Sequence, residues 1–189
     1  MKDLKKTIQA CQKNDRKAQK ALYEHYYGFF ISICYRYESN EQDAVAMVNA
    51  SFLKVLNNLD AYDTDKPFIP WLKRITLNTA IDQLRKKHRL NGQMVLLDEN
   101  EWEQKADVHY NVDVEEEDVT YEDLLALLNS LPEPERTVFN LYAIDELPHK
   151  EIAALLNISE RSSKRHLSNA REQLKKKLSA PEFEMKGAS

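Results

Sequence analysis

The chain has 189 residues, of which 42% are hydrophobic and 31% charged, and its formal net charge is -4. This composition is typical of a globular protein and excludes an intrinsically disordered chain. No apolar run approaches the ~20 residues that are needed to span a bilayer. Three glycines against six prolines leave little room for tight β-turns or a glycine-rich phosphate loop. We therefore expect an all-α fold.

The cysteines and histidines argue against several classes of function. Cys11 and Cys34 have no CxxC partner, and the charged amino-terminal sequence does not resemble a signal peptide, so we expect two reduced thiols in a cytoplasmic protein. A disulfide is not expected, and Cys34 is expected in the core. The five histidines lack metal-ligand spacing, and no nucleophile–base grouping occurs. We expect no enzyme activity, no metal and no cofactor.

Charge is distributed unevenly along the chain. Residues 1–90 carry 16 Lys or Arg against 10 Asp or Glu, residues 91–125 carry one against 12, and residues 126–189 carry 10 against nine. The acidity therefore belongs to a middle segment. We expect two small helical domains joined by an acidic linker, with boundaries at residues 5–91, 92–119 and 120–179.

The first half of the chain is predicted to contain three helices. Apolar and aromatic residues recur at three- and four-residue steps, which predicts helices over residues 5–38 and 41–58 with buried apolar faces. The stretch DAYDTDKPFIP then breaks the pattern with two prolines and three aspartates. We expect Trp71 to begin the third helix.

The third helix has two different faces. Leu77 and Ile81 belong to an apolar stripe, whereas polar and basic side chains fall within an arc of roughly 80° beside it. This second face presents hydrogen-bonding and basic groups, although Asp82 can pair with Arg85 or Lys86 one turn away. Its polar and basic residues, with the cluster that ends the helix, are Arg74, Asn78, Asp82, Arg85, Lys86, Lys87 and Arg89.

The last third of the chain is predicted to form four short helices joined by short turns. Within it, Pro148 suits the start of a helix, Asn157 a left-handed turn, and Ser159 the cap of the next helix. This layout is typical of a helix-turn-helix, whose second helix contacts base edges and phosphates near its N-terminal end. The candidate DNA contacts there are Arg161, Ser162, Lys164, Arg165, His166 and Arg171.

Both halves resemble conserved regions of bacterial RNA polymerase sigma factors. The stretch LPEPERTVFNLYAIDELPHKEIAALLNIS, with the basic helix after it, resembles region four, and WLKRITLNTAIDQLR at residues 71–85 resembles region two. Only these two regions and a short linker are present, as in the extracytoplasmic-function (ECF) group. The resemblance covers roughly residues 6–180.

The resemblance implies a function at promoters. Region four would bind the upstream element of double-stranded promoter DNA, and region two would open the duplex at the downstream element. Asn78 lies where the family reads an unstacked base of the non-template strand, and residues 63–70 would shape the base pocket. The basic side chains of the third helix would hold phosphates. We expect Trp71 to pack in the core, and Phe68 and Tyr62 to be better placed for stacking on bases.

The resemblance also implies partners. The helix at 41–58 corresponds to the family's docking surface for core RNA polymerase. It is less acidic here than in many members, so docking is expected to be more apolar and less sensitive to salt. The family commonly has an anti-sigma partner, and we expect a monomer when free, without membrane insertion. The candidate docking residues are Asp43, Asn49, Phe52 and Lys54.

Several alternatives stay open at this point. The acidic linker is either a solvated spacer or a segment that occupies the RNA path of the polymerase. In region four, Arg161-Ser162-Ser163 replaces the common Gly-Thr-Val, so promoter preference does not carry over. A stand-alone helix-turn-helix regulator would leave the motif at 71–85 unexplained and would usually dimerise on a palindrome. A helical adaptor would not need the basic recognition helix.

Overall fold

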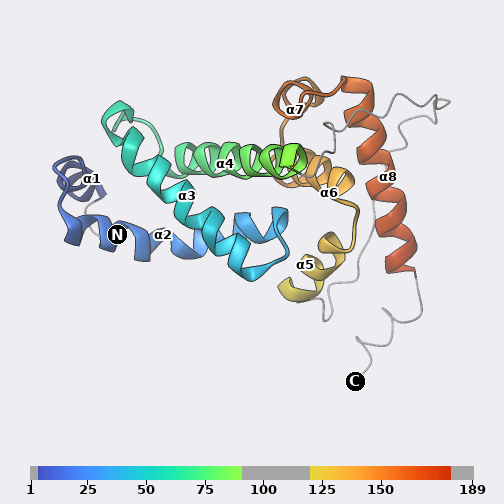
Figure 1. Ribbon diagram of the computed structural model, residues 1–189, viewed down its shortest axis with the longest axis horizontal. Helices are drawn as coiled ribbons and strands as arrows, with labels where there is room; N and C mark the ends of the chain where they lie inside the picture. Colours follow the sequence, from blue (N-terminus) through green and yellow to red (C-terminus); the bar gives the residue numbers. More distant parts are fainter. Residues whose placement is uncertain (1–3, 91–119, 180–189) are drawn as a thin grey trace. The chain divides into compact units, whose positions relative to one another are not determined.

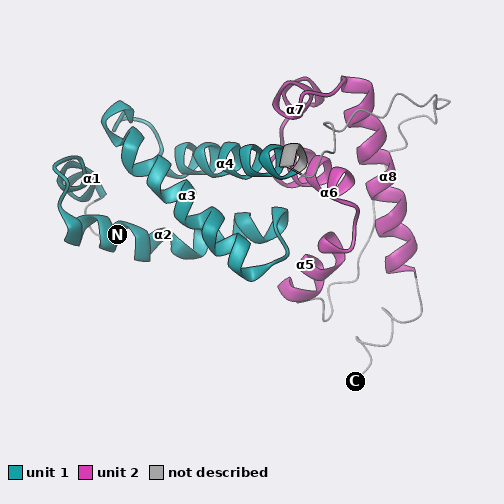
Figure 2. Cartoon of the chain, in the orientation of Figure 1, with its two compact units in different colours: residues 1–93 teal, residues 94–189 magenta. Residues whose placement is uncertain are grey.

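The computed structural model of the chain describes residues 4–90 and 120–179, whose regular structure is entirely helical (Figure 1). The predicted all-α fold is confirmed. The chain divides into two compact units, residues 1–93 and 94–189 (Figure 2). This division falls in the stretch where the linker was predicted, but residues 92–119 lie outside the described residues. The proposed domain boundaries and both interpretations of the linker therefore remain predictions.

Unit one is built from three long helices that pack on one another. Helix α3 lies between α2 and α4, and α1 packs against α2 and a short 3-10 turn, η1. Apolar residues from all of these elements fill the core, among them Ile8, Phe30, Val48 and Leu72. The elements are α1 (Leu4–Gln12), α2 (Arg16–Tyr37), α3 (Glu41–Asn58), η1 (Leu59–Ala61) and α4 (Phe68–Leu90).

The prediction of one helix over residues 5–38 is wrong, because the chain turns between α1 and α2. Asn14 adopts a left-handed conformation with φ 59°, which asparagine tolerates better than most residues. Asp15 then caps α2, since its carboxylate accepts hydrogen bonds from the backbone N–H groups of Lys17 and Ala18 at 2.8 and 3.1 Å. The apolar periodicity continues across this turn, which is why it did not show the break.

Helix α4 begins at Phe68 rather than at Trp71. Pro70 fits in the first turn, where a backbone N–H has no acceptor within the helix. The rings of Tyr62 and Phe68 are buried, with centroids 5.1 Å apart, and Trp71 packs on both at 4.8 and 5.5 Å. Trp71 packs on these rings but is itself half-buried, so it lies at the edge of the core rather than inside it. The expectation that Tyr62 and Phe68 are available for base stacking is wrong.

Unit two contains a helix-turn-helix. Its helices are stabilised at their starts by a capping box at Thr120 and by the Ser159 hydroxyl, which accepts a hydrogen bond from the Ser162 N–H at 3.0 Å. Asn157 ends α7 in the left-handed conformation, φ 56° and ψ 47°, as the sequence predicted. The elements are α5 (Tyr121–Asn129), α6 (Glu133–Phe139), the π-helical turn η2 (Asn140–Ile144), α7 (His149–Leu156) and α8 (Glu160–Leu178).

Both cysteines are buried in unit one, a position that the sequence led us to expect for Cys34 only. Burial raises the pKa of the Cys34 thiol to about 12, and the nearby Arg36 only partly offsets this. Between residues 4 and 90 and between 120 and 179, no helix combines the length and apolar character needed to cross a membrane.

Candidate nucleic-acid interface

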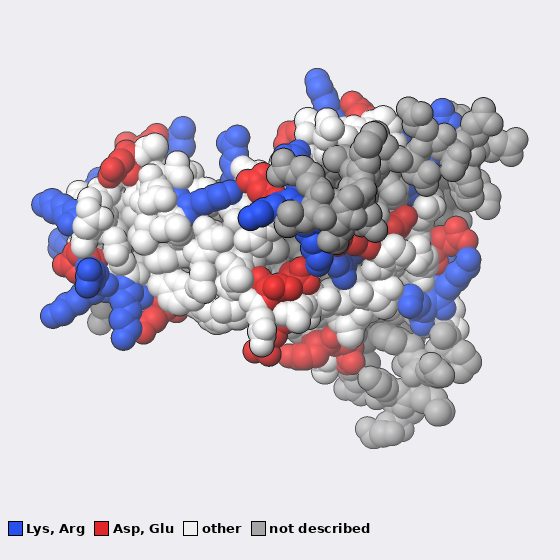
Figure 3. Space-filling model, viewed as in Figure 1, with Lys and Arg blue, Asp and Glu red and all other residues white. Residues whose placement is uncertain are grey.

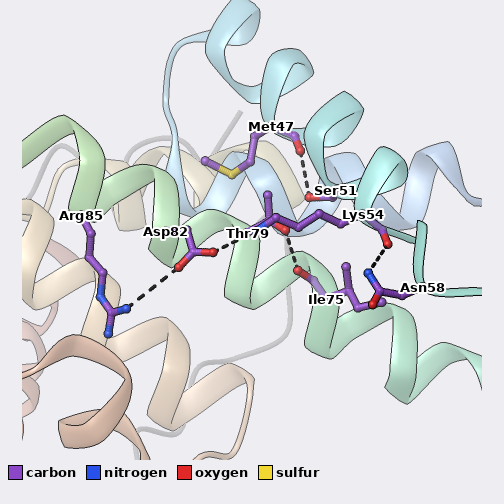
Figure 4. Close-up of polar contacts among 8 residues, drawn as sticks. All are labelled: Met47, Ser51, Lys54, Asn58, Ile75, Thr79, Asp82 and Arg85. Atoms are coloured by element: carbon purple, nitrogen blue, oxygen red, sulfur yellow. Dashed lines mark hydrogen bonds and ion pairs between the residues drawn. The ribbon is translucent and has the colours of Figure 1, made fainter. Parts of the chain in front are cut away.

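The inner face of α4 and the neighbouring α3 carry buried hydroxyl groups where the two helices pack. The buried Thr76 hydroxyl donates to the Leu72 carbonyl at 2.9 Å. Thr79 donates to the Ile75 carbonyl at 2.7 Å and Ser51 on α3 to the Met47 carbonyl at 2.8 Å (Figure 4). These hydroxyls are satisfied within their own helices, so the polar groups do not disturb the apolar packing of α3 against α4.

Arg74 and Asn78 lie on the exposed face of α4. They are separated by four residues, so their side chains are neighbours along the helix. An asparagine amide offers two donors and one acceptor, which suits recognition of a base edge. Arg74 offers the charge that a neighbouring phosphate requires. The structure therefore places the two residues where both can meet an external ligand.

Asp82 joins the two helices of this region. Its Oδ2 lies 2.9 Å from Nζ of Lys54 on α3, and its Oδ1 lies 3.9 Å from Nη1 of Arg85 (Figure 4). The predicted pairing of Asp82 with Arg85 is confirmed. The contact with Lys54 was not predicted, because the distance between α3 and α4 is set by how the two helices pack and not by spacing along either one.

The basic end of α4 is partly committed to the fold. Nζ of Lys87 lies 3.0 Å from Oε2 of Glu38, whose side chain is only 12% exposed at the end of α2. Lys86 is exposed. Arg89 lies in the last turn of α4, beyond the residues whose side chains the structure describes. Lys87 therefore has a structural role in addition to any contact with DNA.

The four predicted docking residues on α3 are not equally accessible. Asp43, Asn49 and Lys54 are exposed, although the Asn49 side chain accepts a hydrogen bond from the Tyr23 hydroxyl at 2.9 Å. The Phe52 ring lies 5.0 Å from the Tyr23 ring and is half-buried. Sequence reasoning missed Leu53, which is 59% exposed. The spacing along α3 could have indicated this, because Leu53 does not lie on the helix face that carries the buried Val48 and Val55.

The start of α8 presents basic side chains as a recognition helix does. Arg161 and Lys164 are exposed, whereas Ser162 and Arg165 are half-buried. The side chain of Ser162 contacts the capping Ser159 hydroxyl at 2.9 Å. Backbone and side-chain bonds at this cap thus fix the first turn of the helix.

His166 has a different environment from the other predicted contacts. It is 6% exposed, and its Nδ1 lies 3.2 Å from Oε1 of Glu135 on α6. Burial opposes ionisation of Glu135, but hydrogen bonds from His166, the Glu135 backbone and Asn169 outweigh it and lower the pKa of the carboxyl. His166 therefore links α8 to α6, and we leave it out of the proposed DNA contacts.

A partly buried contact joins α7 to α8. Nδ1 of His149 lies 2.9 Å from the hydroxyl of Ser163, and the His149 ring stacks on Tyr142 with centroids 4.5 Å apart. The Arg171 guanidinium lies 5.7 Å from the centre of the Tyr142 ring. Arg171 is thereby held by a cation–π contact. Its neighbour Tyr142 lies far from it in sequence, so the pattern along α8 did not reveal this contact.

The described residues contain no group of three or more His, Cys, Asp or Glu side chains arranged to hold a metal ion. Their arrangement is instead that of a two-domain helical protein with a helix-turn-helix, a class that binds DNA. Comparison with known families makes the class specific. The model of the sigma-70 region 2 family matches residues 22–90, and that of sigma-70 region 4 matches residues 121–174.

The chain belongs to the ECF sigma factors of the sigma-70 family of bacterial RNA polymerase. It is 30% identical to the ECF RNA polymerase sigma factor SigW of Bacillus subtilis over 93% of the chain and 96% of that protein. It is 24% identical to an ECF RNA polymerase sigma-E factor of Haemophilus influenzae over 90% of the chain and 93% of that protein.

A solved structure supports the fold. The sigma factor RpoE from Bartonella quintana, in a co-crystal with the anti-sigma factor NepR, aligns with a TM-score of 0.50 and 18% identity over 83% of this chain and 94% of that one. The family shows that the chain functions as an RNA polymerase sigma factor, and it does not favour the stand-alone regulator.

Proposed function

We propose that this sigma factor opens promoter DNA by capturing an unstacked base of the non-template strand on α4. The observation that carries the proposal is the exposure of Asn78 on the outer face of α4, inside the segment that matches sigma-70 region 2. An extruded base bound there stabilises the melted state, so opening needs no nucleotide hydrolysis and the chain needs no enzymatic activity.

Phosphate contacts would flank this base. Arg74 lies one turn before Asn78, and Arg85 and Lys86 follow it towards the end of the helix. Lys87 and Arg89 extend the basic end of α4. Such contacts hold the strand without reading its sequence, so they fix the register in which Asn78 meets its base.

The upstream element would be read by α8 of unit two. Base and phosphate contacts are proposed for the polar and basic side chains outside the core, and the His149–Ser163 contact would hold the recognition helix at its angle to α7. The proposed contact residues on α8 are Arg161, Ser162, Lys164, Arg165 and Arg171.

Core polymerase would dock on the exposed side of α3. Asp43, Asn49 and Lys54 supply polar contacts, and Leu53 supplies the apolar surface that the modest charge of this helix led us to expect. Phe52 is half-buried and packs on Tyr23, so it would hold this part of α3 in place on α2. Removing exposed Leu53 should therefore weaken docking more than removing any one charge.

Regulation by an anti-sigma factor is proposed from the family. The Bartonella relative was crystallised with such a protein, NepR. We propose a cytoplasmic protein that is monomeric when free and is released from this partner to bind core polymerase.

The test is substitution of Asn78 in the full-length protein assembled with core polymerase. Asn78→Ala should leave core binding unchanged and lower duplex opening at least tenfold, measured by the reactivity of unpaired thymines. Gln83→Ala is the matched control, because it lies on α4 about 140° around the helix from Asn78. A template opened in advance should restore initiation by Asn78→Ala.

Two other outcomes would contradict the proposal. Equal loss of core binding and opening would make Asn78 a structural residue. Specific DNA binding by a chain that does not bind core polymerase would instead favour the stand-alone regulator.

A further inference from the structure

A basic surface on α1 and the start of α2 has no role in the function proposed above. Residues 4–21 contain six Lys or Arg and one Asp, a net charge of +5. Figure 3 shows Lys and Arg side chains gathered over these two elements. All six basic residues are exposed, and together they form what we call the α1–α2 basic surface: Lys5, Lys6, Lys13, Arg16, Lys17 and Lys20.

Two acidic side chains of the described residues, Asp15 and Glu24, lie beside this surface. The Asp15 carboxylate accepts hydrogen bonds from two backbone N–H groups, so it serves as the cap of α2. Lys20 lies 3.6 Å from Glu24, but both side chains are largely exposed and such a pair is weak. The surface therefore keeps a net positive charge.

The position of the charges argues against a role in stability. Neither α1 nor α2 has an acidic residue in its first turn, where Lys5, Lys6, Arg16 and Lys17 lie instead. A helix N-terminus carries partial positive charge, so a basic residue there is unfavourable by about 0.3–1 kcal/mol. Side chains that slightly destabilise their own helices and face solvent are best explained by binding to an anionic partner.

The surface lies at the end of unit one where α4 begins. The Gln12 side chain donates a hydrogen bond to the Leu59 carbonyl at 3.0 Å, and α1 packs against η1. Residues 62–67 then lead directly from η1 to α4. The α1–α2 basic surface is thus next to residues 62–67, most of which belong to the segment 63–70 that the resemblance to region two assigns to the base pocket.

The loop itself is a poor place for phosphates. Asp60, Asp63 and Asp65 surround it, and Lys66 already lies 3.7 Å from Asp63. Like charges repel, so a DNA strand that enters this loop with one base would keep its backbone away from the aspartates. The neighbouring α1–α2 basic surface offers the positive charge that the loop lacks.

We propose that the α1–α2 basic surface binds the phosphate backbone of promoter DNA beside the segment that α4 opens. The proposal rests on the function proposed above and adds a third DNA contact to those of α4 and α8. Lysines predominate and no aromatic side chain belongs to the surface, so its contacts are independent of base sequence. They would strengthen promoter binding and make it more sensitive to salt.

The test is to remove three of the charges together. The variant Lys13→Gln/Arg16→Gln/Lys17→Gln is compared with Lys175→Gln/Lys176→Gln/Lys177→Gln, which removes three exposed lysines from the end of α8. Each full-length variant is assembled with core polymerase, and promoter affinity is measured over a range of salt concentrations. Core binding and thermal unfolding of each variant are measured alongside.

We expect the α1–α2 variant to bind the promoter at least tenfold more weakly at low salt. Its slope of log affinity against log salt should be less steep by about 2–3, since each lost phosphate contact reduces the slope by about 0.9. Core affinity should be unchanged, and the unfolding temperature unchanged or higher, because two unfavourable charges leave the start of α2. The α8 control should change the slope of log affinity against log salt less than the α1–α2 variant does.

Other results would overturn the proposal. Unchanged promoter affinity and salt slope would show that DNA does not reach this surface, and loss confined to core binding would assign the surface to the polymerase. Failure of the proposed function has a different signature, because Asn78→Ala would then open the promoter as well as the unaltered chain does. In that case the salt slope of the α1–α2 variant still tests the surface, and a slope equal to that of the unaltered chain would reject it.

Discussion

The Lys54 ammonium lies 2.9 Å from the Asp82 carboxylate and thereby joins the α3 face proposed for polymerase docking to the α4 face proposed for DNA. The same carboxylate lies 3.9 Å from Arg85. One anion therefore balances two cations, each of which belongs to a different proposed interface. The electrostatic properties of the two interfaces are linked through Asp82.

We predict that Asp82→Asn strengthens promoter binding by the assembled polymerase several-fold at low salt, because Arg85 on the DNA-facing side loses its competing anion. Lys54 and Asp82 are about half-exposed, so the free energy of unfolding should change by less than about 1 kcal/mol. Affinity measured at increasing salt should converge with that of the wild type. Weaker binding by a stably folded variant would mean that Asp82 positions the DNA-facing residues.

Lys87 and Lys86 provide a matched pair for separating folding from binding. Lys87→Met leaves the nearly buried Glu38 carboxylate without its 3.0 Å partner, so we predict a loss of about 1–2 kcal/mol in the free energy of unfolding. Lys86→Met should leave stability unchanged, since Lys86 is exposed. Urea unfolding followed by circular dichroism measures both. Similar stability of the two variants would contradict a structural role for Lys87.

Asn157 should tolerate glycine and resist alanine. Its left-handed conformation costs a residue with a Cβ about 1–2 kcal/mol unless the side chain compensates, as asparagine can in part. We predict that Asn157→Gly preserves or raises the stability of unit two, whereas Asn157→Ala lowers it by about 1 kcal/mol. Hydrogen exchange of the α7 and α8 amides in the full chain reports this. Equal protection in the two variants would show that the turn relaxes.

The stability of unit two should decrease in acid through Glu135. The pKa of this carboxyl is lower in the folded protein than its ordinary value of 4.5, so its ionised form stabilises the fold above that pH. The contribution is lost as the pH falls from 4.5 through the folded pKa. Glu135→Gln should flatten this part of the profile, measured from NMR signals of α6 and α8. A profile unchanged by the substitution would assign the acid sensitivity to other groups.

Most of the helical architecture follows from local patterns. The apolar repeat gives the faces of α3 and α4, and the turn between α7 and α8 follows from Asn157 and Ser159, since an asparagine that tolerates positive φ and a capping hydroxyl act within a few residues. The same repeat hid the break at Asn14, because helical periodicity reports which residues are apolar and not where the backbone changes direction.

The sequence by itself determined the helices, the uneven charge along the chain and the two family motifs, all of which depend on residues close together in the chain. Only the tertiary structure decided which polar side chains remain available to a partner. Tyr62 and Phe68 are buried against Trp71, and His166 faces Glu135. The physical reason is that burial and ion pairing depend on the distances between helices, which are set by the packing of whole elements rather than by spacing along one of them.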